Sequence, residues 1–228
     1  MRTEIPFIPR WTLVLLLAAG CNLRGADLSP DAAATSTDDN SLTLGGVQIN
    51  AIYGSAVVST VAGTVGAMGH VDGVGAAARL ATPMGLGTDG FQVYIAEIGS
   101  HTLRSLDPGS LTVTTLAGTP YVPGSGPSQL GSPWDAEPLS GLLYVSEEYT
   151  HVIGSLIPPV HTIAAGLPSN VGSFADGAAA TARFNSPKGL AAAGTDLYIA
   201  DTNNAVIRRF DTVSGTLSLF AGAVKNSG

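Results

Sequence analysis

The chain has little cysteine, little charge and few aromatic side chains. Its 228 residues include one cysteine, and 12% of them are charged and 6% are aromatic. One cysteine excludes an internal disulfide and a zinc site built from several cysteines. The charged fraction is about half of that of a typical globular domain. A coiled coil needs many charged residues, and a disordered chain needs low hydrophobicity with high net charge, so an aliphatic globular chain remains.

Positive charge is also scarce and scattered. The chain has 10 lysines and arginines against 17 acidic residues, which gives a formal net charge of −7. Arg208 and Arg209 form the only adjacent basic pair. Because nucleic-acid binding depends on lysines and arginines that neutralise phosphates, we expect no nucleic-acid partner.

The N-terminal apolar run is shorter than a membrane-spanning helix, which needs about 20 residues. It reads WTLVLLLAAG at residues 11–20, and Arg2 and Arg10 precede it. This length and this charge are typical of a secretory signal peptide. We therefore expect residues 1–20 to be a signal peptide and the protein to be exported.

The predicted signal peptide ends at small residues directly before the single cysteine, as Ala18-Ala19-Gly20-Cys21. This arrangement resembles the lipobox of bacterial lipoproteins, with Ala18 where leucine is commonest. The resemblance implies that Cys21 is lipidated and anchors the protein to a membrane of the cell envelope. The alternative is an ordinary thiol in a protein that is cleaved elsewhere. Residues 21–46 then comprise the lipidated cysteine and a flexible tether rich in Ala, Ser, Thr, Asp and Gly.

Glycine and proline are abundant, with 29 and 14 residues, and many of them lie in an internal repeat. Three segments align without gaps, at residues 83–107, 133–157 and 187–211. In each segment a tyrosine follows the first proline by 11 residues, and an Ala-Gly pair ends the unit further along. The first prolines are 50 and 54 residues apart, which is the period of a repeat architecture.

The third unit shows the expected strands most clearly. Residues 189–194, 197–201, 205–211 and 216–222 alternate in polarity or are bounded by glycine-containing turns. About four strands in about 50 residues, repeated, are typical of a β-propeller blade. The alternation predicts an aliphatic core that contains Val93, Ile95, Leu103, Val145, Ile153, Ile199 and Ile207.

A second motif precedes the first and third units. It begins with Asp-Gly and reaches an arginine seven residues later, from Asp72 to Arg79 and from Asp176 to Arg183. The middle unit lacks this motif, has Asp135 where the other units have glycine, and has no arginine at position 154, so we expect its blade to be irregular. The two Asp–Arg pairs either clamp a ligand or pin the inserted loop by local contacts, and their recurrence favours pinning.

These residues resemble the NHL repeat, above all in the run LYIADTNNAVIRRFD at residues 197–211 and in the Pro-x-Gly-Leu before it. The Asp-Gly element resembles the long NHL repeat of bacterial secreted proteins and of the teneurin propeller. The resemblance covers residues 47–228 and implies an all-β fold, a partial β-propeller of four-stranded blades. We expect about three blades and an N-terminal half-blade at residues 47–63, and we interpret the chain as an incomplete propeller.

Three carboxylates share one repeat position and are the candidates for a metal site: Glu97, Glu147 and Asp201. Carboxylates from successive blades bind Ca²⁺ if they converge on the propeller axis. The alternative, which we favour, is that each caps a turn by accepting backbone N–H groups. His101 and His151 also share a position, but two histidines make a poor zinc site, and we expect them to face solvent or to pack on strands.

The resemblance implies a non-catalytic scaffold that binds a protein or a glycan at the cell envelope, with no cofactor. The alternative is a metal-dependent propeller enzyme of the lyase or lactonase type. We recognise no histidine-rich constellation of such lyases in the sequence, and no nucleophile elbow or His-Glu-x-x-His motif. Binding without catalysis is therefore the expectation.

The lipobox resemblance generates the first testable prediction. The Cys21→Ser variant should be released from membranes or retain its leader, because the hydroxyl does not accept the lipid. Radiolabelled palmitate in a bacterial host should label the wild-type chain and not the variant. An unlabelled wild-type chain would contradict the anchor.

Overall fold

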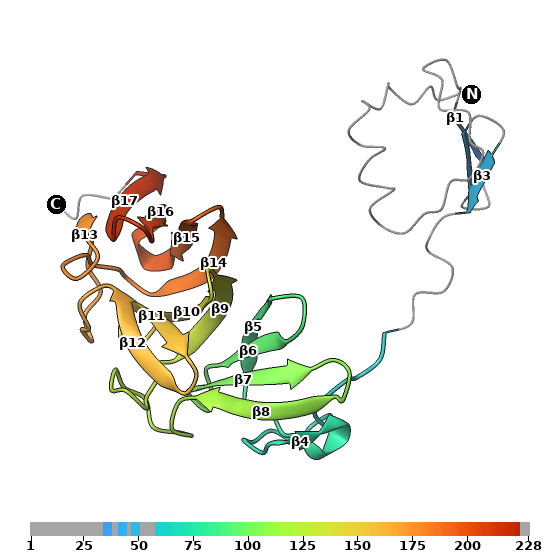
Figure 1. The fold of residues 1–228 in the computed structure, drawn as a ribbon, viewed down its shortest axis with the longest axis horizontal. Helices are drawn as coiled ribbons and strands as arrows, with labels where there is room; N and C mark the ends of the chain where they lie inside the picture. The colour runs from blue at the N-terminus through green and yellow to red at the C-terminus, as the bar shows by residue number, and fades with distance from the viewer. Residues whose placement is uncertain (1–33, 38–40, 45–46, 51–57, 224–228) are drawn as a thin grey trace. The chain divides into compact units, whose positions relative to one another are not determined.

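The computed structural model describes residues 34–37, 41–44, 47–50 and 58–223, in two units that divide at residue 59 (Figure 1). The predicted signal peptide and Cys21 lie outside the described residues. In the first unit β1 (Ala34–Thr37), β2 (Ser41–Leu44) and β3 (Val47–Asn50) form an antiparallel sheet. Two of these strands lie within the predicted tether. The sequences of β2 and β3, SLTL and VQIN, alternate in polarity as paired strands do.

The second unit consists of three antiparallel sheets that follow one another along the chain (Figure 1). Each contains four consecutive strands joined as a meander, so each sheet is one blade and one sequence repeat. The first blade comprises β5 (Pro83–Thr88), β6 (Val93–Glu97), β7 (Thr102–Asp107) and β8 (Thr112–Ala117). The second comprises β9 (Pro133–Leu139), β10 (Leu142–Glu147), β11 (Val152–Ile157) and β12 (Val160–Ala165). The third comprises β14 (Pro187–Ala193), β15 (Asp196–Asp201), β16 (Val206–Asp211) and β17 (Thr216–Ala221).

The predicted strands of the third unit are confirmed, each within two residues at either end. Glycine-containing turns and alternation set these limits, and the other two blades follow the same pattern. Each blade also has a register shift at one equivalent point of its third strand: after Leu103, after Ile153 and after Ile207. Such a bulge re-aims the side chain that follows it.

The Asp-Gly element adds a fifth strand to the blades that carry it. The short strands β4 (Gly73–Val74) and β13 (Gly177–Ala178) pair with β8 and β17, the last strands of their sheets. The 3₁₀ turn η1 (Gly75–Ala77) follows β4 directly. The second blade lacks the motif and has four strands, so its predicted irregularity takes the form of a missing edge strand.

The predicted N-terminal half-blade, residues 47–63, lies partly outside the described residues. Of its described part, β3 pairs with β2, and residues 58–63 contain no strand. A closing strand is held by its ladder to the third strand of its own blade, and no described strand offers this ladder to residues 58–63. The backbone N–H of Gly63 instead donates to the carbonyl oxygen of Gly75 at 3.1 Å.

The first strands of successive blades, β5, β9 and β14, lie side by side. The backbones of β5 and β9 approach so closely that glycine is required. A Cβ atom added at Gly85 would lie 2.6 Å from the Cα atom of Asp135. Gly85 and Gly87 of β5 are therefore required so that the first blade can pack against the second.

Aliphatic side chains fill the space between neighbouring blades. Leu103 of the first blade packs with Val145 and Leu156 of the second, and Ile153 of the second packs with Ile199 of the third. Five of the seven predicted core residues are buried: Ile95, Leu103, Val145, Ile153 and Ile199. Val93 is half-buried beside its cluster.

The prediction for Ile207 is wrong, because its side chain is 37% exposed. Leu103 and Ile153 occupy the equivalent position and are fully buried, since the following blade covers them. No described sheet follows the third blade and covers Ile207 in this way. The sequence pattern identifies the face of the strand, but the next sheet decides its burial.

Ile199 and Ile207 make a matched pair for a stability test. The Ile199→Ala variant should lose about 2–5 kcal/mol of unfolding free energy, because it leaves a cavity between two blades. The Ile207→Ala variant should lose less than about half of that, since its side chain is already partly in water. Denaturant titration of both variants measures the difference. Equal losses would contradict this packing.

Candidate functional site

A buried carboxylate ends the second strand of every blade. Each of the three side chains is fully buried and accepts a backbone N–H from the residue two places before the first strand. The donor–acceptor distances are 3.3 Å from Ala81 to Glu97, 2.7 Å from Gly131 to Glu147 and 2.7 Å from Asn185 to Asp201. The carboxylate thereby ties the loop that leads into its blade to the strand beside it.

A side chain three residues further on supplies a second donor to each carboxylate. The distances are 2.7 Å from Ser100, 2.9 Å from Thr150 and 2.8 Å from Asn204. At this repeat position a hydroxyl group in two blades and an amide group in the third thus donate to the buried carboxylate. Each carboxylate accepts a backbone N–H from the loop before the blade and a side-chain donor from the turn that follows the carboxylate, whereas the turn-capping alternative placed the backbone N–H in that turn.

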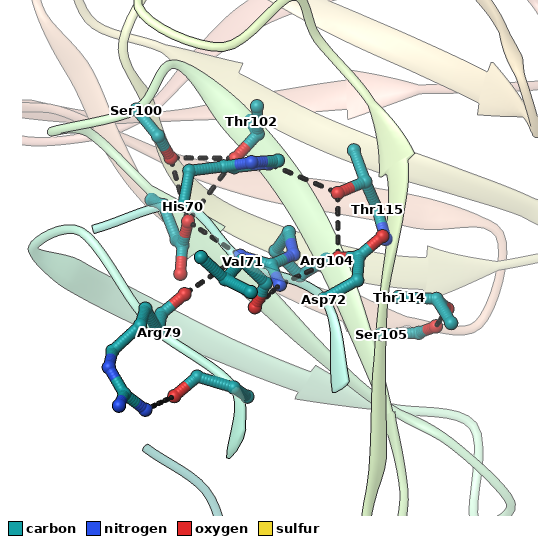
Figure 2. Close-up of polar contacts among 12 residues, drawn as sticks. His70, Val71, Asp72, Arg79, Ser100, Thr102, Arg104, Ser105, Thr114 and Thr115 are labelled. Carbon is teal, nitrogen blue, oxygen red and sulfur yellow. Dashed lines mark hydrogen bonds and ion pairs between the residues drawn. The ribbon is translucent and has the colours of Figure 1, made fainter. Parts of the chain in front are cut away.

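In the first blade a buried guanidinium completes the set of donors (Figure 2). Nη1 of Arg104 lies 3.3 Å from Oε2 of Glu97, and Nη2 lies 2.7 Å from Oδ1 of Asp72. The same guanidinium donates to the carbonyl oxygens of Val71 at 2.9 Å and of Arg79 at 3.3 Å. Arg104 therefore holds the Asp-Gly element against the buried carboxylate.

The third blade repeats this network. Nη1 of Arg208 lies 3.0 Å from Oδ2 of Asp201, and Nη2 lies 2.5 Å from Oδ1 of Asp176. The carbonyl oxygens of Ala175 and Arg183 accept from the same guanidinium at 2.8 and 3.0 Å. Both arginines follow the bulge in their third strand, which aims them at the carboxylate.

The ion-pair partner of Asp72 is thus Arg104 and not Arg79, the end of the sequence motif. Nη1 of Arg79 donates to the carbonyl oxygens of Ala76 and Ala78 at 2.6 and 2.8 Å and so closes its own loop. In the third blade Asp176 likewise pairs with Arg208, while Nη1 of Arg183 donates to the carbonyl oxygen of Leu167 at 3.3 Å. Sequence reasoning named the two aspartates and missed Arg104 and Arg208. The signal in the sequence was that these two arginines share one repeat position, where the middle unit has Gly154.

Asp72 is further fixed by the last strand of its blade. Its Oδ2 and Oδ1 atoms accept from the backbone N–H and the hydroxyl of Thr115 at 3.1 and 3.0 Å. Burial opposes ionisation, but the hydrogen bonds from Thr115 and the positive charge of Arg104 hold the pKa of Asp72 below its ordinary value. Asp72 is therefore the anionic end of the first-blade network.

The second blade neutralises its carboxylate with a histidine. Gly154 stands where the other blades have arginine, and His161 on β12 reaches into the same space. Its Nε2 atom lies 2.7 Å from Oε1 of Glu147, and its Nδ1 atom is 3.4 Å from the carbonyl oxygen of Gly126. A Cβ atom at position 154 would lie 2.7 Å from Oε1 of Glu147, so only glycine leaves room for the imidazole.

His101 and His151 connect neighbouring blades. Both have a left-handed backbone, with φ of 58° and 57°. Nδ1 of His101 is 3.3 Å from the hydroxyl of Ser132, and Nδ1 of His151 accepts the backbone N–H of Ser186 at 2.9 Å. Burial lowers the pKa of both rings. Each histidine therefore joins its blade to the start of the next, and each contact suits a neutral ring.

Within residues 58–223 and the strands before them, no three His, Cys, Asp or Glu side chains are grouped so that they could hold a metal ion. The same described residues contain no helix long and apolar enough to cross a membrane. Glu97, Glu147 and Asp201 are each enclosed in their own blade.

Two aromatic and two charged side chains lie at one end of the blades and are wholly or partly exposed. Antiparallel order places the second-to-third-strand loops and the starts of the first strands at this end. Trp134 and Lys188 are the second residues of β9 and β14, and Glu148 and Tyr149 lie in the loop after β10. The Lys188 Nζ atom lies 3.3 Å from Oε1 of Glu148 and 3.8 Å from the centre of the Trp134 ring. We call these four residues the loop-end surface.

The fold and the repeated networks define a propeller-type β protein built from NHL-like blades. No protein-family model matches the chain. It is 30% identical over 158 residues to NHL repeat-containing protein 2 of Bos taurus, covering 68% of this chain and 15% of that protein. It is also 30% identical over 144 residues to the chloroplastic protein SUPPRESSOR OF QUENCHING 1 of Arabidopsis thaliana, covering 57% and 14%. The chain thus spans about a seventh of the length of these curated relatives.

A solved structure shows the same fold. An auxiliary nutrient binding protein from Bacteroides ovatus matches with a TM-score of 0.51 at 16% identity, over 64% of this chain and 37% of that one. The chain is a propeller-like all-β protein whose sequence is similar to NHL-repeat proteins.

The His161–Glu147 pair generates a pH prediction. Burial opposes protonation of His161, but the close contact with the Glu147 carboxylate and its negative charge raise the pKa of His161 above the ordinary value. A raised histidine pKa stabilises the fold below the unfolded-state pKa of about 6.5, and this stabilisation is lost as the pH rises through the folded-state pKa. The loss should be about 1.4 kcal/mol for each unit by which the pKa is raised.

The measurement compares wild type with His161→Gln from about pH 5.5 to about pH 9, around the ordinary histidine pKa. The difference in unfolding free energy between the two proteins should shrink as the pH rises, because only the wild type loses a charge next to Glu147. His101 and His151 are present in both proteins and cancel. A difference that does not change with pH would contradict a charged pair.

Proposed function

We propose that this protein is a non-catalytic binding scaffold that presents its loop-end surface to a protein or glycan partner. The proposal rests on the observation that different side chains stabilise the blade and face the solvent. The buried carboxylates and their partners are occupied by contacts that hold the blade together, whereas Trp134, Glu148, Tyr149 and Lys188 stand at the surface.

The composition of the loop-end surface supports a binding role. Aromatic side chains are enriched at the centres of protein interfaces, where they provide much of the binding energy. Tyr149 is 55% exposed, and Trp134 of the same blade is half-buried. The residues that carry the surface belong to strand starts and to tight loops fixed by the buried carboxylates. The Tyr149 backbone N–H, for example, donates to the carbonyl oxygen of Gly131 at 2.9 Å, so the loop is held in place before a partner arrives.

We further propose that the scaffold acts at the cell envelope. The support is the predicted signal peptide and the cysteine at its end, which would place the blades outside the inner membrane. Under this proposal the loop-end surface meets partners of the envelope or the surroundings of the cell.

Site-specific photocrosslinking tests the scaffold. A photoreactive amino acid at position 149 should yield a discrete crosslinked species in the cell envelope, because the partner covers the loop-end surface. The matched control is position 91, where Phe91 is 82% exposed in a turn at the opposite end of its blade. Crosslinking should be lost in the Trp134→Leu background. Equal crosslinking from both positions, or none from either, would contradict the proposal.

A further inference from the structure

Trp134 and Glu148 together hold an alkylammonium group, that of Lys188. We call this pair of side chains the ammonium receptor. Both residues belong to the second blade, whereas the ammonium that they hold, that of Lys188, comes from the third. An aromatic face and a carboxylate are the two groups that recognise a lysine side chain. Nζ of Lys188 is 3.8 Å from the ring centre and 3.3 Å from the carboxylate oxygen. The contact therefore shows how this pair of groups holds a cation.

The blade scaffold does not require this receptor. The first blade has Met84 and Ile98 at the positions of Trp134 and Glu148, and the third has Lys188 and Thr202. All three blades form a first strand at this position and a four-residue connection between the second and third strands, although the connection of the third blade contains the 3₁₀ turn η2 (Thr202–Asn204). The pairing of an indole with a carboxylate is thus an addition to the second blade that its fold does not explain.

The contact of Lys188 with Glu148 is partly open to solvent. The Lys188 side chain is 25% exposed and that of Glu148 is 32% exposed, so water reaches the ion pair. Partly exposed ion pairs are weak, and a lysine stem is flexible, so an ammonium group from a partner can displace that of Lys188. The formal net charge of −7 also attracts positively charged partners.

We propose that Trp134 and Glu148 bind a lysine side chain of a partner protein, and that Lys188 occupies the site in the free protein. The inference rests on the proposed function and names the chemistry of the partner. Tyr149, exposed next to Glu148, supplies a second aromatic surface for the partner segment. The incoming ammonium replaces that of Lys188 on the same two groups, so that Lys188 lowers the affinity for the partner.

The probe is a fluorescein-labelled glycine-rich peptide with two lysines, followed by fluorescence anisotropy with the full-length protein. Its acetyl-lysine counterpart is the matched control. Removal of the internal occupant in Lys188→Met should tighten binding of the lysine peptide about tenfold, which corresponds to about 1.4 kcal/mol. The acetyl-lysine peptide should not gain, because it carries no charge.

A double variant separates the receptor from the general charge effect. Lys188→Met with Trp134→Leu has the same net charge as Lys188→Met but lacks the indole, and should lose the tenfold gain. Lys188→Met with Trp134→Phe keeps an aromatic face and should retain part of the gain, which also serves if the leucine variant does not fold. A gain that survives in the leucine variant, or no gain in Lys188→Met, would overturn the inference. A choline-headgroup vesicle that binds Lys188→Met more tightly than the lysine peptide does would assign the site to a lipid and overturn it too.

The two proposals fail in different ways. If Lys188→Met shows no gain while position 149 still crosslinks selectively, the loop-end surface binds a partner by other chemistry. If position 149 also fails to crosslink, the scaffold proposal is wrong as well as the proposal of a lysine site.

Discussion

Each blade depends on one buried carboxylate. A carboxylate removed from water is costly unless charged or hydrogen-bonding groups surround it, so each blade has to bring donors to that point. The donors come from the loop before the blade, from the turn after the second strand and from the third or fourth strand. The same contact thus fixes three segments and the entry into the blade, and with it the position of the first strand against its neighbour.

The repeats solve this electrostatic requirement in two ways. The first and third blades use Arg104 and Arg208, whose guanidinium groups have donors to spare and also bind the Asp-Gly element. The second blade has no such element, and an imidazole from the neighbouring strand takes the place of the guanidinium beside Gly154. The loss of the inserted strand and the loss of the arginine are therefore one structural change, because each removes the partner of the other. It also leaves one blade whose internal pair can titrate near neutral pH, whereas an arginine keeps its charge.

This internal arrangement leaves the loop-end surface free to vary. The loops after β6, β10 and β15 are each held by a side chain that donates to the buried carboxylate. The outward side chains of these loops differ from blade to blade, with Ile98, Glu148 and Thr202 at one position. A rigid repeat with variable outward positions is how loops acquire binding roles on a stable scaffold. The indole, the carboxylate and the ammonium meet there because successive blades place their first strands side by side.

The sequence by itself determined the all-β class, the four strands of each blade and five of the seven predicted core residues, whereas the fifth strand of two blades was expected as an inserted loop. Local alternation, glycine turns and the spacing of the repeat carry this information, because strands and hairpins depend on neighbours in the sequence. Only the tertiary structure decided that Asp72 pairs with Arg104 and not Arg79, that His161 replaces an arginine, and that Ile207 is partly exposed. These outcomes depend on groups that are distant in the chain and on the sheet that does or does not cover a face, and neither pattern nor spacing within one unit contains that information.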